Sequence, residues 1–270
     1  MILSLALLIG LAAYLFSTPD IARLKQKNPG KTSFMKYRER EWKRTGKQHR
    51  IHQQWVSLSQ ISSYLIKAVL IAEDDKFWSH EGFDYESMRK ALEKDVRARK
   101  FKLGGSTISQ QLAKNLYLSP TKSLFRKIRE AVITWRMERV LKKRRILELY
   151  LNVAEWGDRG LFGIGAAAGH YYGKSPAELG PEEAARLAAV LPNPRKYSPV
   201  GESAYVLHRA ALIYSIMVRR GIVVPEYEEV YKDVAGEDGT ISETHLPCMP
   251  FLQESPDRIP AGDEPLHYHE

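Results

Sequence analysis

The sequence predicts a mainly α-helical protein that follows an N-terminal membrane anchor. Apolar residues recur every three or four positions from Ser57 onward, and convincing strand alternation is scarce. The first residues are different, because residues 2–16 are almost continuously apolar. With 270 residues, of which 44% are hydrophobic and 27% charged, the chain can bury one sizeable core but cannot hold two full catalytic domains.

The apolar run is about the length at which a signal peptide and a short membrane span are hard to separate. No small-x-small cleavage site follows it, and no basic residues precede it. We therefore expect residues 1–18 to be an uncleaved single-pass anchor, with a buried core helix as the alternative. The nearby basic residues Arg23, Lys25 and Lys27 lie after the span, so charge alone predicts the orientation opposite to the one adopted below.

Three further segments follow the anchor. Residues 19–50 carry a dense basic run with little apolar periodicity, which indicates a solvated connector that is either attracted to anionic lipid or simply soluble. Residues 51–235 form the folded domain, with helices expected from Ser57 and at about 84–100, 106–117, 120–141, 144–152, 161–171, 181–190 and 203–220. Residues 236–270 are rich in Pro, Glu, Asp and His, which is typical of a disordered tail.

The charge balance indicates an anionic partner. Lys and Arg outnumber Asp and Glu by 41 to 32, and nucleic acid, phospholipid or a phosphate-bearing substrate would each fit that excess. The single Cys248 excludes a disulfide framework and lies far from the motif-rich centre, so it is a poor candidate nucleophile. The tail histidines lack the spacing of a metal site.

A first cluster of acids, Glu73-Asp74-Asp75, ends the apolar helix and is followed by Phe77 and Trp78. A carboxylate among apolar side chains loses hydration, which raises its pKa toward the range in which it exchanges protons. Glu73 is therefore a candidate general base. Alternatively, these acids only cap and solubilise a helix end, and the cluster alone does not decide between the two.

A second cluster runs from Gly104-Gly105 through Ser106 into a predicted helix. Backbone N–H groups and hydroxyls at such a helix start favour a phosphate. Along the helix, positions i, i+4, i+7 and i+8 place polar side chains on one face, namely Thr107, Gln111, Lys114 and Asn115. A purely structural helix would not need this polar face, so the pattern indicates an anion-binding surface.

A third cluster, Arg126-Lys127-x-x-Glu130, puts Arg126 and Glu130 one helical turn apart. In isolation such a pair is most often solvent-exposed and contributes under about 1 kcal/mol. If this face turns inward, Glu130 becomes a second acid facing Glu73 across a groove. Arg126 and Lys127 would then be cations for a phosphate leaving group.

Taken in order, these segments resemble the peptidoglycan glycosyltransferases, known as glycosyltransferase family 51. The similarity covers roughly residues 57–200 and consists of four motifs: Glu73-Asp74-x-x-Phe77-x-x-His80-x-Gly82, the Gly104 to Asn115 run, Arg126-Lys127-x-x-Glu130, and Lys143-x-x-Ile146-Leu147-Glu148-x-Tyr150-Leu151-Asn152. Four long motifs in this order are highly specific. The resemblance implies a lysozyme-like helical lobe, a smaller membrane-facing jaw lobe and an active-site groove between them.

The resemblance also implies a role for each matching residue. The acid matching Glu73 deprotonates the acceptor sugar's 4-hydroxyl, which attacks and inverts the anomeric carbon of the growing chain and expels undecaprenyl pyrophosphate. The acid matching Glu130 assists that departure, directly or through a pyrophosphate-bound Mg²⁺ or Mn²⁺ ion, and no organic cofactor is expected. Phosphate contacts match Lys114, Arg126 and Lys127, and positions that shape the donor site match Ser106, Thr107, Gln111 and Asn115.

The expected partners are lipid II, the growing glycan strand and membrane lipid, with penicillin-binding proteins and division machinery as further partners and no nucleic acid. The expected location is the cell inner membrane, with the catalytic domain on the periplasmic side. No transpeptidase activity is expected, because no second domain follows. The main alternative is a glycan-cleaving lysozyme or lytic transglycosylase, which needs no pyrophosphate site, and a non-enzymatic alternative is a membrane-tethered basic scaffold.

Overall fold

The computed structural model of the protein describes residue 10 and residues 19–97, 105–121 and 123–224. Apart from Gly10, the expected anchor at residues 1–18 lies outside the described residues, as does the expected tail at residues 236–270. Within the described ranges, no helix has both the length and the hydropathy that a membrane crossing requires.

The prediction of a mainly helical fold is confirmed. The α-helices are α2 (Ser33–Arg44), α3 (Ser63–Glu73), α4 (Tyr85–Arg97), α5 (Ile108–Tyr117), α6 (Leu124–Val140), α7 (Lys143–Val153), α8 (Ile164–Tyr172), α9 (Pro181–Val190) and α10 (Ala204–Arg219). Three short 3₁₀ helices, η1 (Ala22–Lys25), η2 (Leu58–Gln60) and η3 (Pro176–Glu178), and two short strands, β1 (His52–Gln53) and β2 (Leu161–Phe162), complete the described elements.

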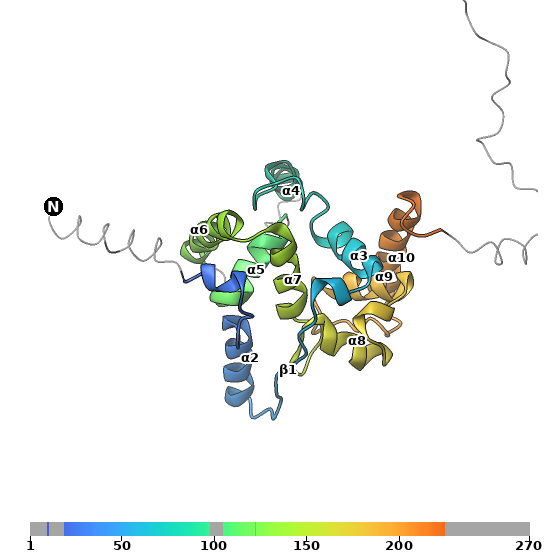
Figure 1. Cartoon of the computed structure of the whole chain (residues 1–270), viewed down its shortest axis with the longest axis horizontal. Coiled ribbons are helices and arrows are strands. Elements are labelled where there is room, and N and C mark those ends of the chain that lie inside the picture. The colour runs from blue at the N-terminus through green and yellow to red at the C-terminus, as the bar shows by residue number, and fades with distance from the viewer. Residues whose placement is uncertain (1–9, 11–18, 98–104, 122, 225–270) are drawn as a thin grey trace, which may run out of the picture. The chain divides into compact units, whose positions relative to one another are not determined.

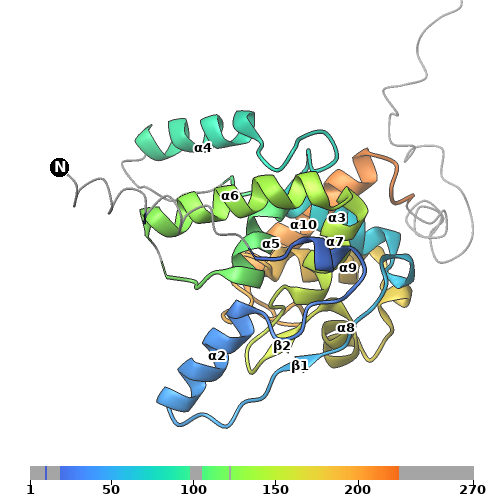
Figure 2. The same cartoon turned by 60° about the vertical axis from the view of Figure 1, so that its left-hand side comes forward.

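The helices form two packed groups that meet in one hydrophobic core. Helices α3, α9 and α10 pack against one another, and α5 packs against α2, α6 and α7. Figure 1 shows α7 between α5 and α6 on one side and α3, α9 and α10 on the other. Figure 2 shows α4 at the outer edge of the molecule, running in a direction similar to that of α6. The core is continuous, because buried side chains such as Leu65, Leu149 and Met217 belong to a single cluster.

The ends of α5 and α9 follow from local sequence. Thr107 caps α5: its side chain accepts a hydrogen bond from Gln110 N–H, and the Gln110 side chain accepts one from Thr107 N–H. Pro181 occupies the first turn of α9, where its missing N–H and fixed φ are favourable. These signals explain why both helices begin within two residues of the predicted starts.

The expectation that residues 19–50 are a solvated connector is wrong for α2. Its side chains Met35, Arg38 and Trp42 are buried, and the helix packs against α5. They recur at intervals of three and four residues, as an inward helical face does, but charged residues between them mask the pattern. The folded core therefore includes part of the segment that was expected to be a connector.

The loop at residues 156–160 leads from the end of α7 into β2, which pairs in parallel with β1. Trp156 is fully buried and donates its indole N–H to Leu151 O at 3.3 Å, while Gly160 O accepts His52 N–H at 2.8 Å. Gly160 has a φ of +91°, and a Cβ there would lie 2.1 Å from Arg50 O. Only glycine fits this close approach, so the loop has a structural function.

Candidate active site

Glu73 is the last residue of α3 and is almost withdrawn from solvent, with its side chain 10% exposed. Its Oε2 accepts a hydrogen bond from Gln111 Nε2 at 2.8 Å, and Arg209 Nη2 lies 3.8 Å from its Oε1. Burial raises the pKa of Glu73 above its ordinary value, and the hydrogen bond from Gln111 and the charges of Arg209 and Lys114 oppose that rise. Burial and these contacts therefore act on the pKa of Glu73 in opposite directions, and burial is the larger effect.

The neighbouring acid, Asp74, has a structural function. Its Oδ2 accepts Ile108 N–H at 2.9 Å, which satisfies a free donor at the start of α5, and its Oδ1 lies 2.9 Å from His80 Nε2. Gly82 N–H donates to His80 Nδ1 at 3.0 Å, so His80 Nε2 carries the proton that is donated to Asp74. This chain of contacts fixes the end of α3 against the start of α5, and with it the position of Glu73.

The second cluster divides into residues that face the site and one that does not. The Thr107 hydroxyl donates to Gly82 O at 2.7 Å and accepts Gln110 N–H at 3.2 Å, and the residue is 2% exposed. Thr107 was predicted to shape the donor site. In the structure its hydroxyl caps α5 and contacts Gly82 O. Ser106 and Gln111 face the site, and Lys114 and Asn115 line the adjoining cavity together with Gln111.

The helix face that carries Arg126 and Glu130 turns Glu130 inward, and the exposed ion pair that is usual for this spacing is not what the structure shows. Glu130 is 3% exposed, and its two carboxylate oxygens are engaged by Arg126 Nη1 at 2.7 Å and by Lys127 Nζ. Because both oxygens are taken by cations, Glu130 is poorly placed as a direct metal ligand. The described residues contain no group of three or more acidic, histidine or cysteine side chains arranged to hold a metal ion. The described residues around Glu130 therefore do not fit a resident divalent cation.

The two glutamates belong to one network. Gln111 bonds to Glu73 and, more weakly, to Ser106 O at 3.5 Å, while Lys127 Nζ bonds to Ser106 Oγ at 3.2 Å and to Glu130. Lys114 lies within the electrostatic field of both carboxylates: burial lowers its pKa, and Glu130 and Glu73 counteract that effect. The two acids that were predicted to share a site are connected by this network.

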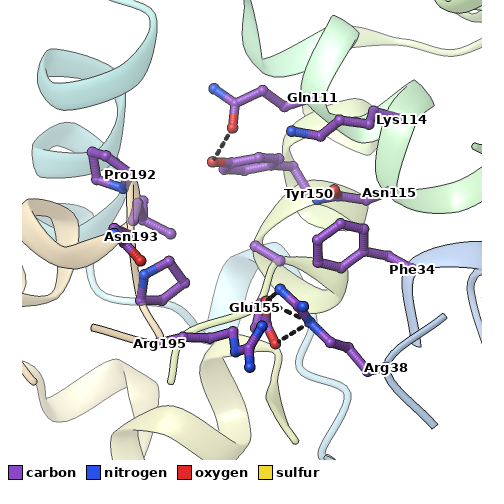
Figure 3. A pocket seen from close by; sticks show the side chains of 13 residues that line it. Phe34, Arg38, Gln111, Lys114, Asn115, Tyr150, Glu155, Pro192, Asn193 and Arg195 are labelled. Carbon is purple, nitrogen blue, oxygen red and sulfur yellow. Dashed lines mark hydrogen bonds and ion pairs between the residues drawn. The ribbon is translucent and has the colours of Figure 1, made fainter. Parts of the chain in front are cut away.

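A cavity of about 200 Å³ opens beside this network (Figure 3). Its walls come from α2, α5 and α7 and from the segment after α9, and its lining residues are Phe34, Arg38, Gln111, Lys114, Asn115, Tyr150, Ala154, Glu155, Leu191, Pro192, Asn193, Pro194 and Arg195. Figure 3 shows Gln111 and Lys114 at one end and the ion pair of Arg38 with Glu155 at the other. An elongated ligand lying in this cavity would meet an amide and an ammonium group next to Glu73.

Sequence analysis missed three side chains that support the site. Tyr150 donates its hydroxyl to Gln111 Oε1 at 3.2 Å, Arg209 lies beside Glu73, and Arg38 reaches the cavity from α2. Tyr150 stands in the fourth motif, none of whose residues was expected in the site, and Arg209 lies beyond the motifs. Only the tertiary arrangement brings Tyr150 and Arg209 to the residues around Glu73.

The sequence profile of the family described as transglycosylase matches residues 39–218. The chain belongs to the transglycosylase family. Three similar proteins bear the name biosynthetic peptidoglycan transglycosylase. The one from Dechloromonas aromatica (strain RCB) is 51% identical over 190 residues, which cover 70% of this chain and 82% of that protein. The one from Azoarcus sp. (strain BH72) is 53% identical over 192 residues, covering 71% and 82%.

The third relative, from Alcanivorax borkumensis (strain ATCC 700651 / DSM 11573 / NCIMB 13689 / SK2), is 46% identical over 215 residues, covering 80% of this transglycosylase and 84% of that protein. The resemblance drawn from the four motifs is confirmed. The matched region contains all of the residues around Glu73 and Glu130, whereas the first half of α2, including Phe34 and Arg38, precedes it.

Proposed function

We propose that this transglycosylase polymerises lipid II into peptidoglycan glycan strands by inverting glycosyl transfer, with release of undecaprenyl pyrophosphate. The observation that carries the proposal is the contrast between two connected carboxylates. Glu73 is buried with one amide donor in hydrogen-bond reach, whereas Glu130 is saturated by Arg126 and Lys127. A proton acceptor, Glu73, is therefore connected to a group of cations that can bind an anion. Lys114 lies in the electrostatic field of both acids.

In the proposed reaction, Glu73 takes the proton of the acceptor's 4-hydroxyl as that oxygen attacks the anomeric carbon of the growing chain. The bond from this carbon to the pyrophosphate oxygen breaks, and its electron pair leaves with the pyrophosphate. A base with a raised pKa has a higher affinity for the proton that it must accept. The hydrogen bond from Gln111 keeps the ionised form accessible.

The departing negative charge is stabilised by Lys114, Arg126 and Lys127. Lys114 is largely desolvated, and electrostatic interactions strengthen where water is excluded. In this proposal Glu130 holds the side chains of Arg126 and Lys127 in place and balances their charge before the substrate arrives. No step in this scheme runs through a metal ion.

The same cations favour synthesis over cleavage of glycan. A lysozyme or lytic transglycosylase acts on glycosidic bonds and expels a sugar hydroxyl, so it has no use for three cations beside its acid. The surroundings of Glu130 fit a pyrophosphate leaving group instead. A basic scaffold without activity would not need a buried carboxyl such as Glu73.

We also propose that the end of the molecule formed by α4 and α6 faces the membrane as the smaller jaw lobe. Large apolar side chains are exposed there, namely Tyr85, Met88, Leu124, Phe125, Ile128 and Trp135. Exposed apolar groups interspersed with basic residues favour a lipid surface. These side chains support attachment to a membrane surface. The location we propose is the periplasmic face of the inner membrane, beside lipid II and near penicillin-binding proteins and division machinery.

The test is polymerisation of purified lipid II by the full chain, measured as glycan strands on a gel. Glu73→Gln should reduce the rate by at least a factor of about 10², because Gln cannot accept the proton, while Glu202→Gln at an exposed carboxyl should leave it unchanged. Moenomycin, which resembles the family's donor, should inhibit the wild type. Cleavage of finished murein without polymer formation would instead favour the lytic alternative.

A further inference from the structure

The orientation of the Gln111 side-chain amide is determined by its surroundings. One end of the amide faces two acceptors, Glu73 Oε2 at 2.8 Å and Ser106 O at 3.5 Å. If the amide were flipped, its oxygen would face both of them, and neither the carboxylate nor the carbonyl has a proton to donate. The NH₂ group must therefore point to Glu73, which leaves Oε1 at the opposite end in need of a donor.

Tyr150 supplies that donor. Its hydroxyl lies 3.2 Å from Gln111 Oε1. The residue is 1% exposed, because its ring is buried where α7 packs against α5. Figure 3 shows the hydroxyl pointing at the Gln111 oxygen. Burial raises the pKa of Tyr150 well above 10, and the charges of Glu73 and Asp74 add to the rise. The phenol therefore remains a donor at every pH at which the protein is assayed.

We propose that Tyr150 is a positioning residue that sets the proton affinity of Glu73 by fixing the Gln111 amide. This deepens the proposed function, on which its link to catalysis rests. Without the phenol hydroxyl, Gln111 Oε1 loses its donor and that end of the amide is no longer held. The amide then spends part of its time withdrawn from Glu73, and the ionised carboxylate loses stabilisation.

The other groups that act on Glu73 would remain in place in a Tyr150 variant. They are Arg209 from α10, Lys114 from α5 and Asp74 at the end of its own helix, and no charged group of α9, which packs along α3, is among them in the described structure. Loss of the hydroxyl should therefore raise the pKa of Glu73 through a single contact, with the surrounding charges unchanged.

The test is a carbon-13 NMR titration of the Glu73 side-chain carboxyl in the full chain, with the signal assigned from Glu73→Gln. Tyr150→Phe should raise the pKa of Glu73 by about one pH unit. The matched control is Tyr171→Phe, which also removes a hydroxyl with a 3.2 Å hydrogen bond, in that case to Trp156 O away from the site. Equal pKa values in wild type and Tyr150→Phe would overturn the proposal, as would an equal shift in the control.

Two further measurements separate positioning from packing. In a Gln111→Met background, Tyr150→Phe should not shift the pKa of Glu73 further, because the amide that connects Tyr150 to Glu73 is already absent. A full additional shift would contradict the proposal. If Tyr150→Phe does not fold, the wild type carries the test. Its Gln111 side-chain amide protons should exchange with solvent much more slowly than those of exposed Gln26, and equally fast exchange would exclude a fixed amide.

The kinetic counterpart uses the lipid II assay. In Tyr150→Phe the acid limb of the pH–rate profile should move to higher pH by the same amount as the Glu73 pKa. The rate should fall about tenfold at a pH below the apparent pKa values of both proteins, and by less at a pH above them. If the wild type itself makes no polymer, the proposed function fails, yet the NMR titration still decides the role of Tyr150. If the wild type is active and the limb does not move, the positioning role fails alone.

Discussion

Arg38 and Glu155 form a two-point ion pair at the far end of the cavity from Gln111 and Lys114. Arg38 Nε lies 2.9 Å from Glu155 Oε1 and Nη2 lies 2.7 Å from Oε2, and the side chains are 10% and 6% exposed. Burial raises the pKa of Glu155, and Arg38 opposes that rise. The pair joins α2 to the segment after α7, and so joins the start of the folded chain to the wall of the site.

Breaking this pair should destabilise the fold. Arg38→Ala leaves Glu155 buried without its partner, and the expected loss in the free energy of unfolding is about 3–5 kcal/mol. Urea denaturation followed by circular dichroism measures it. The control is Lys31→Ala, which removes the partner of Glu39 in a pair with side chains 58% and 35% exposed, where a change of at most about 1 kcal/mol is expected. Equal losses in the two variants would contradict the buried role of Arg38.

The Arg38 pair also shows where sequence reasoning stops. Helix positions followed from local signals, such as the Thr107 cap and Pro181, and the three clusters named both acids and most of the cations. Arg38 was assigned to a linker because its partner is 117 residues away and its own neighbours are mostly charged. Thr107 shows the opposite error, since spacing placed it on a polar face but could not reveal that Gly82 O uses its hydroxyl.

Glu73→Gln should stabilise the fold at neutral pH while it removes activity. The folded-state pKa of Glu73 is raised above 4.5, so the ionised form costs stability above the folded pKa, and this cost vanishes below the unfolded value. The melting temperature of the variant should therefore exceed that of wild type at pH 7 to 8 by about 2–4 °C for each kcal/mol recovered. The difference should shrink as the pH falls toward 4.5. A variant that melts lower at every pH would show that Glu73 is not strained by its burial.

Arg209→Met should move the acid limb of the polymerisation profile to higher pH. Arg209 Nη2 lies 3.8 Å from Glu73 Oε1, and its positive charge lowers the pKa of that carboxyl. Removing the charge raises the pKa, so a larger fraction of the enzyme is protonated at a given pH and the rate falls there. Arg219→Met, on the exposed last turn of the same helix, is the control and should leave the profile unchanged. A uniform loss of rate at all pH values would assign Arg209 a packing role instead.

Lys114→Met, like Glu73→Gln, should raise the stability of the fold and lower the activity, in this case by removing a buried positive charge. Burial lowers the pKa of the Lys114 ammonium, and among the hydrogen bonds of the described residues none ties that group to the protein. The charged form is therefore costly at neutral pH, and Met should raise the melting temperature there. The gain should fade as the pH rises toward 10.5, where the unfolded chain also loses the proton.

In the lipid II assay, Lys114→Met should lose about 10²–10³ in rate, the magnitude typical of one charge-stabilising group in a desolvated site. Lys67→Met on the exposed face of α3 should change neither rate nor melting temperature. An ammonium that makes no hydrogen bond within the described part of the chain, and that costs the fold stability, is expected where an anion becomes its partner during turnover. If Lys114→Met were both active and more stable, the leaving group would have to be stabilised by Arg126 and Lys127 alone, although Glu130 already engages both of them.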